Sequence, residues 1–272
     1  MSDAPVIEVE DRGGVRHLWF NRPAVHNAQN VAMLRLLQEV LDDTGSNPSV
    51  RVLVVGGRGP SFCSGHDLKE MAVNPEYAAN ASTAEGRYRQ ELRLFVRPVE
   101  TLQQLDIPTI CRVHGYCMAA GLMFAGACDF AVASDDAVFA SPVVRTQGVS
   151  DAEVPLLSWI LGERRAKQML WLGERLSAEQ ARDAGLVNWV VPRDGLDARV
   201  DEVATSLCEA PREVLALSKA SFRFLAQRQG WNDYAAFHYV NHQFSHQTAE
   251  AAELLRARVE RVREGKAPHQ ED

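Results

Sequence analysis

The segment over residues 109–133 constrains the fold more than any other part of the chain. Residues 109–113 and 130–133 have the apolar, β-branched composition of buried strands, and the segment HGYCMAAGLMFAGACD (114–129) lies between them. It predicts a short apolar helix rich in alanine and glycine. Small residues at the start of a helix let a second backbone or a ligand approach the first turn, where free N–H groups and the helix dipole favour negative charge. The segment therefore predicts either a helix that is buried for packing alone or a helix whose N-terminus faces a ligand.

The rest of the pattern indicates a mixed α/β core followed by helices. From residue 196 onward it is helical with almost no strand signal, so we expect a core over 1–195 that holds the site and a C-terminal helical region over 196–272. The polar, alanine-rich stretch over 74–86 is the expected mobile segment. Further strands are predicted over 6–10, 15–20, 50–55 and 187–191, and helices over 30–43, 87–105 (interrupted near Pro98), 164–172 and 177–184.

Composition excludes several classes of protein. Hydrophobic residues make up 46% of the chain, which is enough for a real core in one large or two small domains. The 29 basic and 36 acidic residues give a net charge of −7 without a basic block, so we expect no nucleic-acid partner. No apolar run is long enough to span a bilayer and the N-terminus has no apolar signal core, so we expect no membrane partner. Five cysteines without a C-x-x-C pair indicate reduced, mostly buried thiols and hence a cytoplasmic protein.

A second motif, GPSFCSGHDLKEM (59–71), also follows a predicted strand and opens a predicted helix. Together with NRPAVHNA (21–28), CDFAVAS (128–134), AVFASP (137–142) and the stretch from SAEQA to GLV (177–187), it resembles the crotonase superfamily, also called the enoyl-CoA hydratase/isomerase family. The resemblance runs from about residue 7 to residue 192. It implies an α/β core built as a spiral of strand–strand–helix units, with C-terminal helices that pack into trimers, often paired into hexamers. It also implies a coenzyme A thioester as substrate and no prosthetic group.

In the crotonase pattern two backbone N–H groups hold the thioester oxygen, and the matching positions here are His66 and Ala120. Such donors stabilise the enolate that forms when a proton is moved beside the thioester carbonyl. Alanines stand at 119 and 120, where the family usually has glycine; they narrow the pocket slightly without removing the donors. The His66 side chain is either a catalytic imidazole or a side chain displayed beside a loop whose backbone matters.

The acid–base groups depart from the hydratase pattern. The two positions where enoyl-CoA hydratases of this family carry glutamates hold Met123 and Val143, which cannot exchange protons with a substrate. Other members place a single carboxylate further along, and here Asp151 is the first candidate and Glu153 the second. In an apolar pocket the pKa of such a carboxyl group would be raised, which suits a base near neutral pH. The alternative is that either residue caps a helix starting near Ala152.

By the same resemblance, two loops would bind the coenzyme. The loop that contains Ala24 and His26 would contact the adenine and ribose end, and Asp67, Leu68 and Lys69 would follow the pantetheine and the phosphates. Lys69 has the charge to meet a phosphate. A lysine in the first turn of a surface helix is also common without such a role.

Three histidines lie outside the family signal. His238, His242 and His246 follow an i, i+4, i+8 spacing, which places three imidazoles on one helical face. Two such histidines can bind zinc, but the sequence has no His-Glu-x-x-His motif and no carboxylate on that face. We therefore expect no metal and interpret the three histidines as an interface or solvent-facing stripe.

These features predict an acyl-CoA-processing enzyme that stabilises a thioester enolate, with double-bond isomerisation as the favoured reaction because both hydratase glutamates are replaced. A divergent hydratase, or a hydrolase or lyase that holds water with other groups, is the first alternative. A non-catalytic acyl-CoA-binding protein is the second. A carboxylate pointing into the acyl pocket would favour the enzyme, since fold alone does not decide function.

Overall fold

The computed structural model describes residues 4–263 and contains one six-stranded sheet and one small three-stranded sheet. In the large sheet the order is β1-β2-β3-β4-β6-β9; β1 and β2 form an antiparallel hairpin, and the other neighbours are parallel. The strands are β1 (Ile7–Arg12), β2 (Val15–Phe20), β3 (Val52–Gly57), β4 (Thr109–Val113), β6 (Phe130–Ser134) and β9 (Trp189–Val191) in the large sheet, and β5 (Tyr116–Met118), β7 (Val138–Ala140) and β8 (Leu176–Ser177) in the small one.

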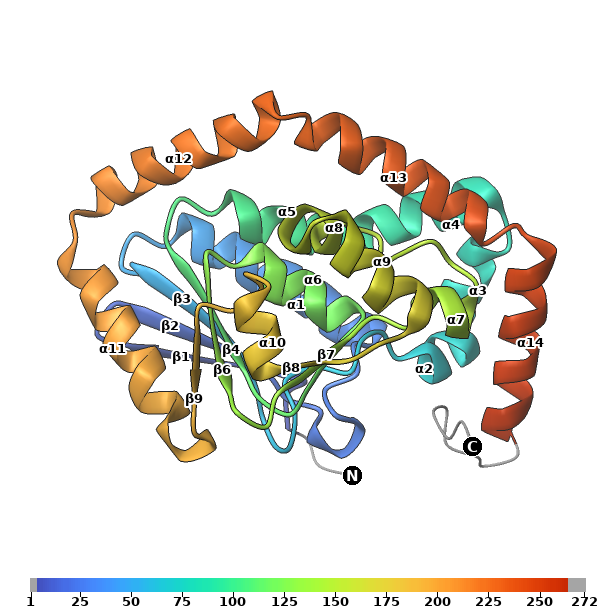
Figure 1. Cartoon of the computed structure of the whole chain (residues 1–272), viewed down its shortest axis with the longest axis horizontal. Helices are drawn as coiled ribbons and strands as arrows, with labels where there is room; N and C mark the ends of the chain where they lie inside the picture. The colour runs from blue at the N-terminus through green and yellow to red at the C-terminus, as the bar shows by residue number, and fades with distance from the viewer. Residues whose placement is uncertain (1–3, 264–272) are drawn as a thin grey trace.

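Helices cover both faces of the large sheet (Figure 1). The main hydrophobic core lies between the sheet and a group of helices that includes α1 (Val31–Ser46), α5 (Arg97–Gln104), α6 (Ala120–Ala127) and α8 (Leu156–Leu161). A second, smaller core lies on the opposite face, where α11 (Leu196–Glu209) packs against alternate strand residues such as Val54 and Val132. The first C-terminal helix therefore packs directly on the sheet of the α/β core, and the division of the chain at 195/196 stays a prediction.

The predicted mobile segment over 74–86 is helical in the structure. It forms α3 (Pro75–Ala81) and the start of α4 (Ala84–Glu91), whose first turns are capped by the side chains of Asn74 and Thr83. The predicted interruption near Pro98 is a π-helical turn, η2 (Leu92–Val96), directly before α5. The remaining elements between β2 and β9 are η1 (Pro23–Val25), α2 (Leu68–Val73), α7 (Val143–Gln147), α9 (Glu163–Leu172) and α10 (Ala178–Asp183).

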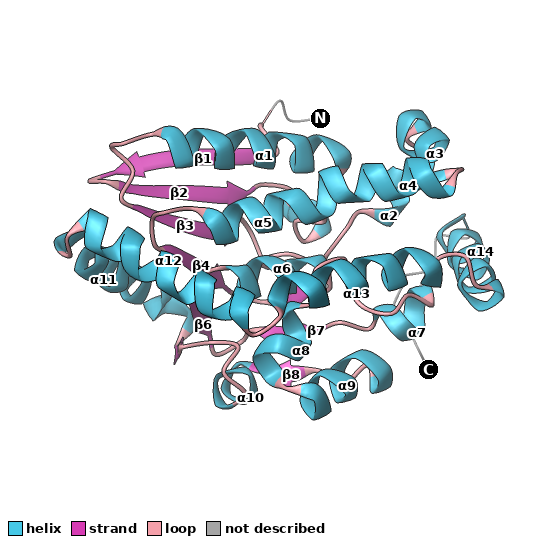
Figure 2. Ribbon diagram, turned by 90° about the horizontal axis from the view of Figure 1, so that it is seen from above, coloured by secondary structure: helices cyan, strands magenta, loops and turns pink. Residues whose placement is uncertain are grey.

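Beyond η3 (Arg193–Gly195) and α11, the chain continues as α12 (Arg212–Arg228), α13 (Trp231–Ser245) and α14 (Ala249–Arg263), which run across the outside of the core helices (Figure 2). No residue of α12 is buried; the helix is fastened to the core by Lys219, whose Nζ lies 2.6 Å from an Asp129 oxygen. Large apolar side chains on α12 and α13 are exposed: Val214, Leu217, Phe222, Phe224, Leu225, Phe237, Val240 and Phe244. None of the helices within residues 4–263 is long and apolar enough to cross a membrane.

Candidate active site

Two turns place the predicted N–H donors side by side. One turn precedes α2 and contains Gly65, which has a φ of +97°; a Cβ atom there would lie 3.5 Å from the backbone nitrogen of Ala120. The other turn opens α6, and Gly121 in it approaches the first so closely that a Cβ atom would lie 2.8 Å from the Cys63 carbonyl oxygen. Within the described chain, the N–H groups of His66 and Ala120 donate to no other group. Both are therefore available to an acceptor in the cavity that both residues line.

Ala119, between the two donors, has an unusual backbone. Its φ of +47° and ψ of −114° belong to a region that favours glycine. The turn keeps this conformation because the Ala119 N–H donates to the Ala140 carbonyl oxygen at 2.9 Å and its carbonyl accepts from Leu122 N at 2.9 Å. The backbone at 119 is therefore strained in the turn that presents the Ala120 N–H group.

The two candidate carboxyl groups line the cavity at these turns. It has a volume of about 60 Å³, and its wall includes Asp151 and Glu153 together with Leu68 and Val143. Asp151 is 4% exposed, and its carboxylate accepts a hydrogen bond from the Ala152 N–H at 2.6 Å. Burial raises the pKa of Asp151 to about 7. The capping alternative is wrong for both residues, since α8 begins only at Leu156 with Pro155 at its N-cap.

Glu153 lies between two imidazoles. Its Oε1 atom is 3.7 Å from Nδ1 of His66 and 3.7 Å from Nε2 of His242. The His66 ring stacks on Phe95 with ring centroids 3.9 Å apart, and burial lowers its pKa. No group in the described chain bonds its Nε2 atom. The His66 side chain is therefore a neutral ring packed against the site, with one nitrogen facing Glu153.

The histidine stripe on α13 faces the core, so its interpretation as an interface or solvent-facing surface is wrong. His238 bonds to the Ala152 carbonyl oxygen at 2.8 Å, and His242, which is 1% exposed, bonds through Nδ1 to the Asp151 carbonyl oxygen at 2.8 Å. His242 and His246 line the same cavity as Asp151 and Glu153. The C-terminal helices thus supply part of the cavity wall.

Sequence reasoning missed Glu91 on α4. Its buried carboxylate lies 3.6 Å from Nε2 of His242 and 3.7 Å from Nε2 of His246, and it also pairs with Arg87 at 3.2 Å. Despite burial, hydrogen bonds and charge from the two histidines lower the pKa of Glu91 to about 2. Burial lowers the pKa of His246 to about 4, whereas the carboxylates around His242 outweigh its burial and raise its pKa. A single glutamate on a polar helix carries no sequence signal of this contact.

The two positions that lack hydratase glutamates differ in the structure. Val143 lines the cavity with an isopropyl group, and Met123 is 1% exposed in the main hydrophobic core. Neither side chain can hold or ionise a water molecule.

The predicted coenzyme residues lie in and beside η1 and at the start of α2, and their contacts with a coenzyme stay predictions. Ala24 and Lys69 are exposed, while Leu68 lines the cavity. His26 bonds to the Ser61 hydroxyl at 2.9 Å. The Asp67 carboxylate caps α2 and pairs with Arg22 at 2.8 Å, so it already has two structural partners.

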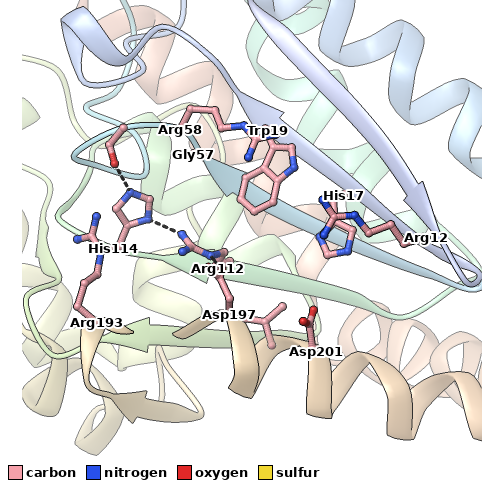
Figure 3. Close-up of a pocket in the computed structure, with 12 residues that line it drawn as sticks. Arg12, His17, Trp19, Gly57, Arg58, Arg112, His114, Arg193, Asp197 and Asp201 are labelled. Carbon is pink, nitrogen blue, oxygen red and sulfur yellow. Dashed lines mark hydrogen bonds and ion pairs between the residues drawn. The ribbon is translucent and has the colours of Figure 1, made fainter. Parts of the chain in front are cut away.

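Two larger cavities lie elsewhere. One of about 320 Å³ between α4–α5 and α13 is lined mostly by apolar and aromatic side chains and shares Glu153 with the site cavity. The other, of about 360 Å³, lies between the sheet and α11 (Figure 3). There Arg112 donates to Nδ1 of His114 at 2.8 Å, and Nε2 of His114 donates to the Gly59 carbonyl oxygen at 3.0 Å. Burial and the charges of Arg112 and Arg193 lower the pKa of His114 to about 4.

All five thiols are free; Cys63, Cys111 and Cys117 are buried, and Cys128 and Cys208 are partly buried. Burial raises the pKa of Cys63 to about 11, which makes its thiol a poor nucleophile.

Fold and site together define an α/β protein in which two residues with free backbone N–H groups line one cavity with two buried carboxyl groups. The family model described as enoyl-CoA hydratase/isomerase matches residues 10–264, and the chain belongs to this family, the crotonase superfamily. The predicted family and fold class are confirmed. Enzymes of this family act on CoA thioesters without a prosthetic group, and the chain is an acyl-CoA-processing enzyme of the same family.

Three comparisons illustrate its relationships. The chain is 31% identical to enoyl-CoA hydratase domain-containing protein 3, mitochondrial, of Xenopus laevis over 82% of this chain and 73% of that one. It is 32% identical to 4-chlorobenzoyl coenzyme A dehalogenase-2 of Arthrobacter sp over 78% and 76% of the two chains. The crystal structure of an enoyl-CoA hydratase/isomerase from Xanthobacter autotrophicus Py2 superposes with a TM-score of 0.85 at 29% identity, covering 95% and 93%.

Proposed function

We propose that this enzyme isomerises the double bond of an enoyl-CoA through a thioester enolate. The N–H groups of His66 and Ala120 would hold the thioester oxygen, where negative charge develops. Two fixed backbone donors suit this task because they need no reorganisation during the reaction; the loss of one typically raises the barrier by about 3–4 kcal/mol. The free state of both N–H groups beside a buried carboxyl group is the observation that carries the proposal.

Asp151 is the group we assign to proton transfer. Isomerisation requires a carboxylate that takes a proton from the α-carbon and returns it at the γ-carbon. Because the same group acts first as a base and then as an acid, its pKa must lie near neutral pH. Burial gives Asp151 such a pKa, about 7. Glu153 is the second candidate: held near His66 and His242, it lies where the site cavity meets the apolar cavity.

The acyl chain would extend past Glu153 into the apolar cavity of about 320 Å³. Leu92, Val96, Trp231 and Val240 line it, and they suit a hydrocarbon or aromatic tail. The thioester would then lie in the small cavity beside Ala120, with the coenzyme following Leu68 and Lys69 outward and the loop of Ala24 and His26 meeting its adenine end.

The direct test is conversion of 3-enoyl-CoA to 2-enoyl-CoA, followed by the conjugated thioester absorbance. We expect Asp151→Asn to lower kcat by about 10²–10⁴-fold and Glu153→Gln to lower it by less than about tenfold, with both variants still binding the product. The reverse order would assign the base to Glu153. Wild-type protein that binds enoyl-CoA without converting it would support the non-catalytic binder instead.

A displacement reaction is the second candidate, because two relatives are named as dehalogenases. In that case the Asp151 carboxylate would attack the carbon of the acyl group that carries a halogen, halide would leave, and water would then hydrolyse the ester formed with Asp151. A single turnover in ¹⁸O water would distinguish the two: displacement followed by hydrolysis labels the Asp151 carboxyl group, and isomerisation leaves it unlabelled. Hydration through other groups would appear in the same assay as a 3-hydroxyacyl product.

We further propose that the protein is a homotrimer, or a hexamer of two trimers, in the cytoplasm. The exposed phenylalanine and leucine side chains on α12 and α13 form an apolar surface of the kind that a second copy covers. The free thiols suit a reducing compartment.

A further inference from the structure

A buried cluster of two histidines and one glutamate lies at the edge of the site cavity. Glu91 comes from α4 and His242 from α13, which runs beside α4 (Figure 1), and His246 directly follows the last residue of α13. The side chains of Glu91 and His242 are each 2% exposed and that of His246 is 19% exposed. One donor atom from each residue lies within 4.8 Å of the other two.

The distances among the three donor atoms match the ligand shell of a small metal ion. Nε2 of His242 and Nε2 of His246 are 3.1 Å apart, and a Glu91 oxygen lies 3.6 and 3.7 Å from them. A tetrahedral zinc ion with bonds of about 2.0–2.1 Å holds its ligand atoms about 3.3–3.4 Å apart. Movements of a few tenths of an ångström would therefore bring all three atoms into coordination.

Further hydrogen bonds orient two of the three side chains, those of His242 and Glu91, for this role. A carbonyl oxygen can only accept, so the bond from Nδ1 of His242 to the Asp151 carbonyl fixes the proton on Nδ1 and leaves the lone pair of a neutral ring on Nε2. Gln243 donates to the same Glu91 oxygen at 2.7 Å, and Arg87 donates to the other at 3.2 Å. Such outer contacts are typical of histidine and carboxylate ligands at metal sites.

The charges around the cluster also allow a divalent ion. Two carboxylates, Glu91 and Glu153, stand against the single positive charge of Arg87, and Glu153 lies 3.7 Å from Nε2 of His242 on the cavity side. His242 and His246 line the cavity whereas Glu91 does not, so a fourth coordination position would face the cavity. Three protein ligands with one open position is the arrangement of catalytic zinc sites.

We propose that Glu91, His242 and His246 form a binding site for a divalent transition-metal ion of the zinc type. Its ligand atoms are different from the His66 and Ala120 N–H donors and from the Asp151 carboxylate, although His242 and His246 line the same cavity. An ion there would join α4 to α13 and fix the wall of the cavity.

The test is cobalt binding by the full chain after removal of metal with a chelator. Co²⁺ is the probe because a tetrahedral site gives it strong visible absorption, and Zn²⁺ is then added as a competitor. We expect saturation at one ion per chain, displacement by Zn²⁺, and a rise in the thermal unfolding temperature with Zn²⁺. His246→Ala should weaken binding by roughly 100-fold or more. His238→Ala, one turn away on the same helix face and outside the cluster, should bind as the wild type does.

Glu91→Gln keeps the shape of the buried side chain and provides a second test if His246→Ala does not fold. Circular dichroism identifies which variants are folded. Absence of stoichiometric cobalt uptake by the wild type, or equal uptake by wild type and a folded ligand variant, would overturn the proposal and leave the cluster as an ion-paired network. Neither result bears on enoyl-CoA conversion, which is measured separately.

Discussion

Replacing Ala119 with glycine should stabilise the protein. The φ of +47° and ψ of −114° at this position disfavour any residue with a Cβ atom, and such strain costs about 1–3 kcal/mol. Glycine removes the strain but gives the unfolded chain more freedom, which offsets about 0.4–1 kcal/mol. The expected net gain is about 1 kcal/mol, equivalent to a rise of about 2–3 °C in Tm for a chain of this size.

Urea unfolding followed by circular dichroism measures this change, with a calorimetric Tm as the second readout. The matched control is Ala125→Gly in the body of the same helix, where the backbone is ordinary and glycine should destabilise by about 1 kcal/mol or more. Because the turn also presents the Ala120 N–H group, KM for enoyl-CoA should change little if the turn keeps its shape. An Ala119→Gly protein as unstable as Ala125→Gly would refute the claim that position 119 is strained.

Two further predictions concern other parts of the molecule. The pKa of His114 is about 4 in the folded protein and about 6.5 in an unfolded chain, so the unfolded state binds more protons between these pH values. The contribution of His114 to the free energy of unfolding should therefore be fully present above about pH 6.5 and fall by about 2–3 kcal/mol as the pH decreases to 4. Between pH 7 and pH 5, the free energy of unfolding should decrease less in His114→Asn than in the wild type. On α12, Phe222 is 70% exposed, and Phe222→Glu should convert trimers to monomers in light scattering after size exclusion, while Gln227→Glu should not. Trimers that persist in Phe222→Glu would place the subunit interface elsewhere.

Much of the fold could be predicted because its signals are local. Strand β4 has the predicted bounds, Asn30 caps α1 through a bond from Met33 N, and the small residues of α6 allow the close approach to Cys63 that they indicate. Position 119 shows the limit of such signals, because an alanine does not reveal a positive φ that its surroundings impose.

The candidate site was partly predictable because local sequence motifs mark some of its residues. The motif positions His66 and Ala120 line one cavity with Asp151 and Glu153, and the catalytic roles of these four residues stay predictions. The contact between Glu91 and His242 joins residues that are 151 positions apart through the packing of α4 against α13. Only the tertiary structure reveals it, and the same packing turns the histidine face inward.

Deuterium exchange in D₂O tests the central claim most directly. Enoyl-CoA incubated with enzyme should incorporate deuterium at both the α- and the γ-carbon, as measured by NMR or mass spectrometry, and Asp151→Asn should abolish this exchange while Glu153→Gln retains it. Such a result would establish an enolate and a proton-transferring role for Asp151. Tight binding without exchange at either carbon, or full exchange in Asp151→Asn, would contradict the account.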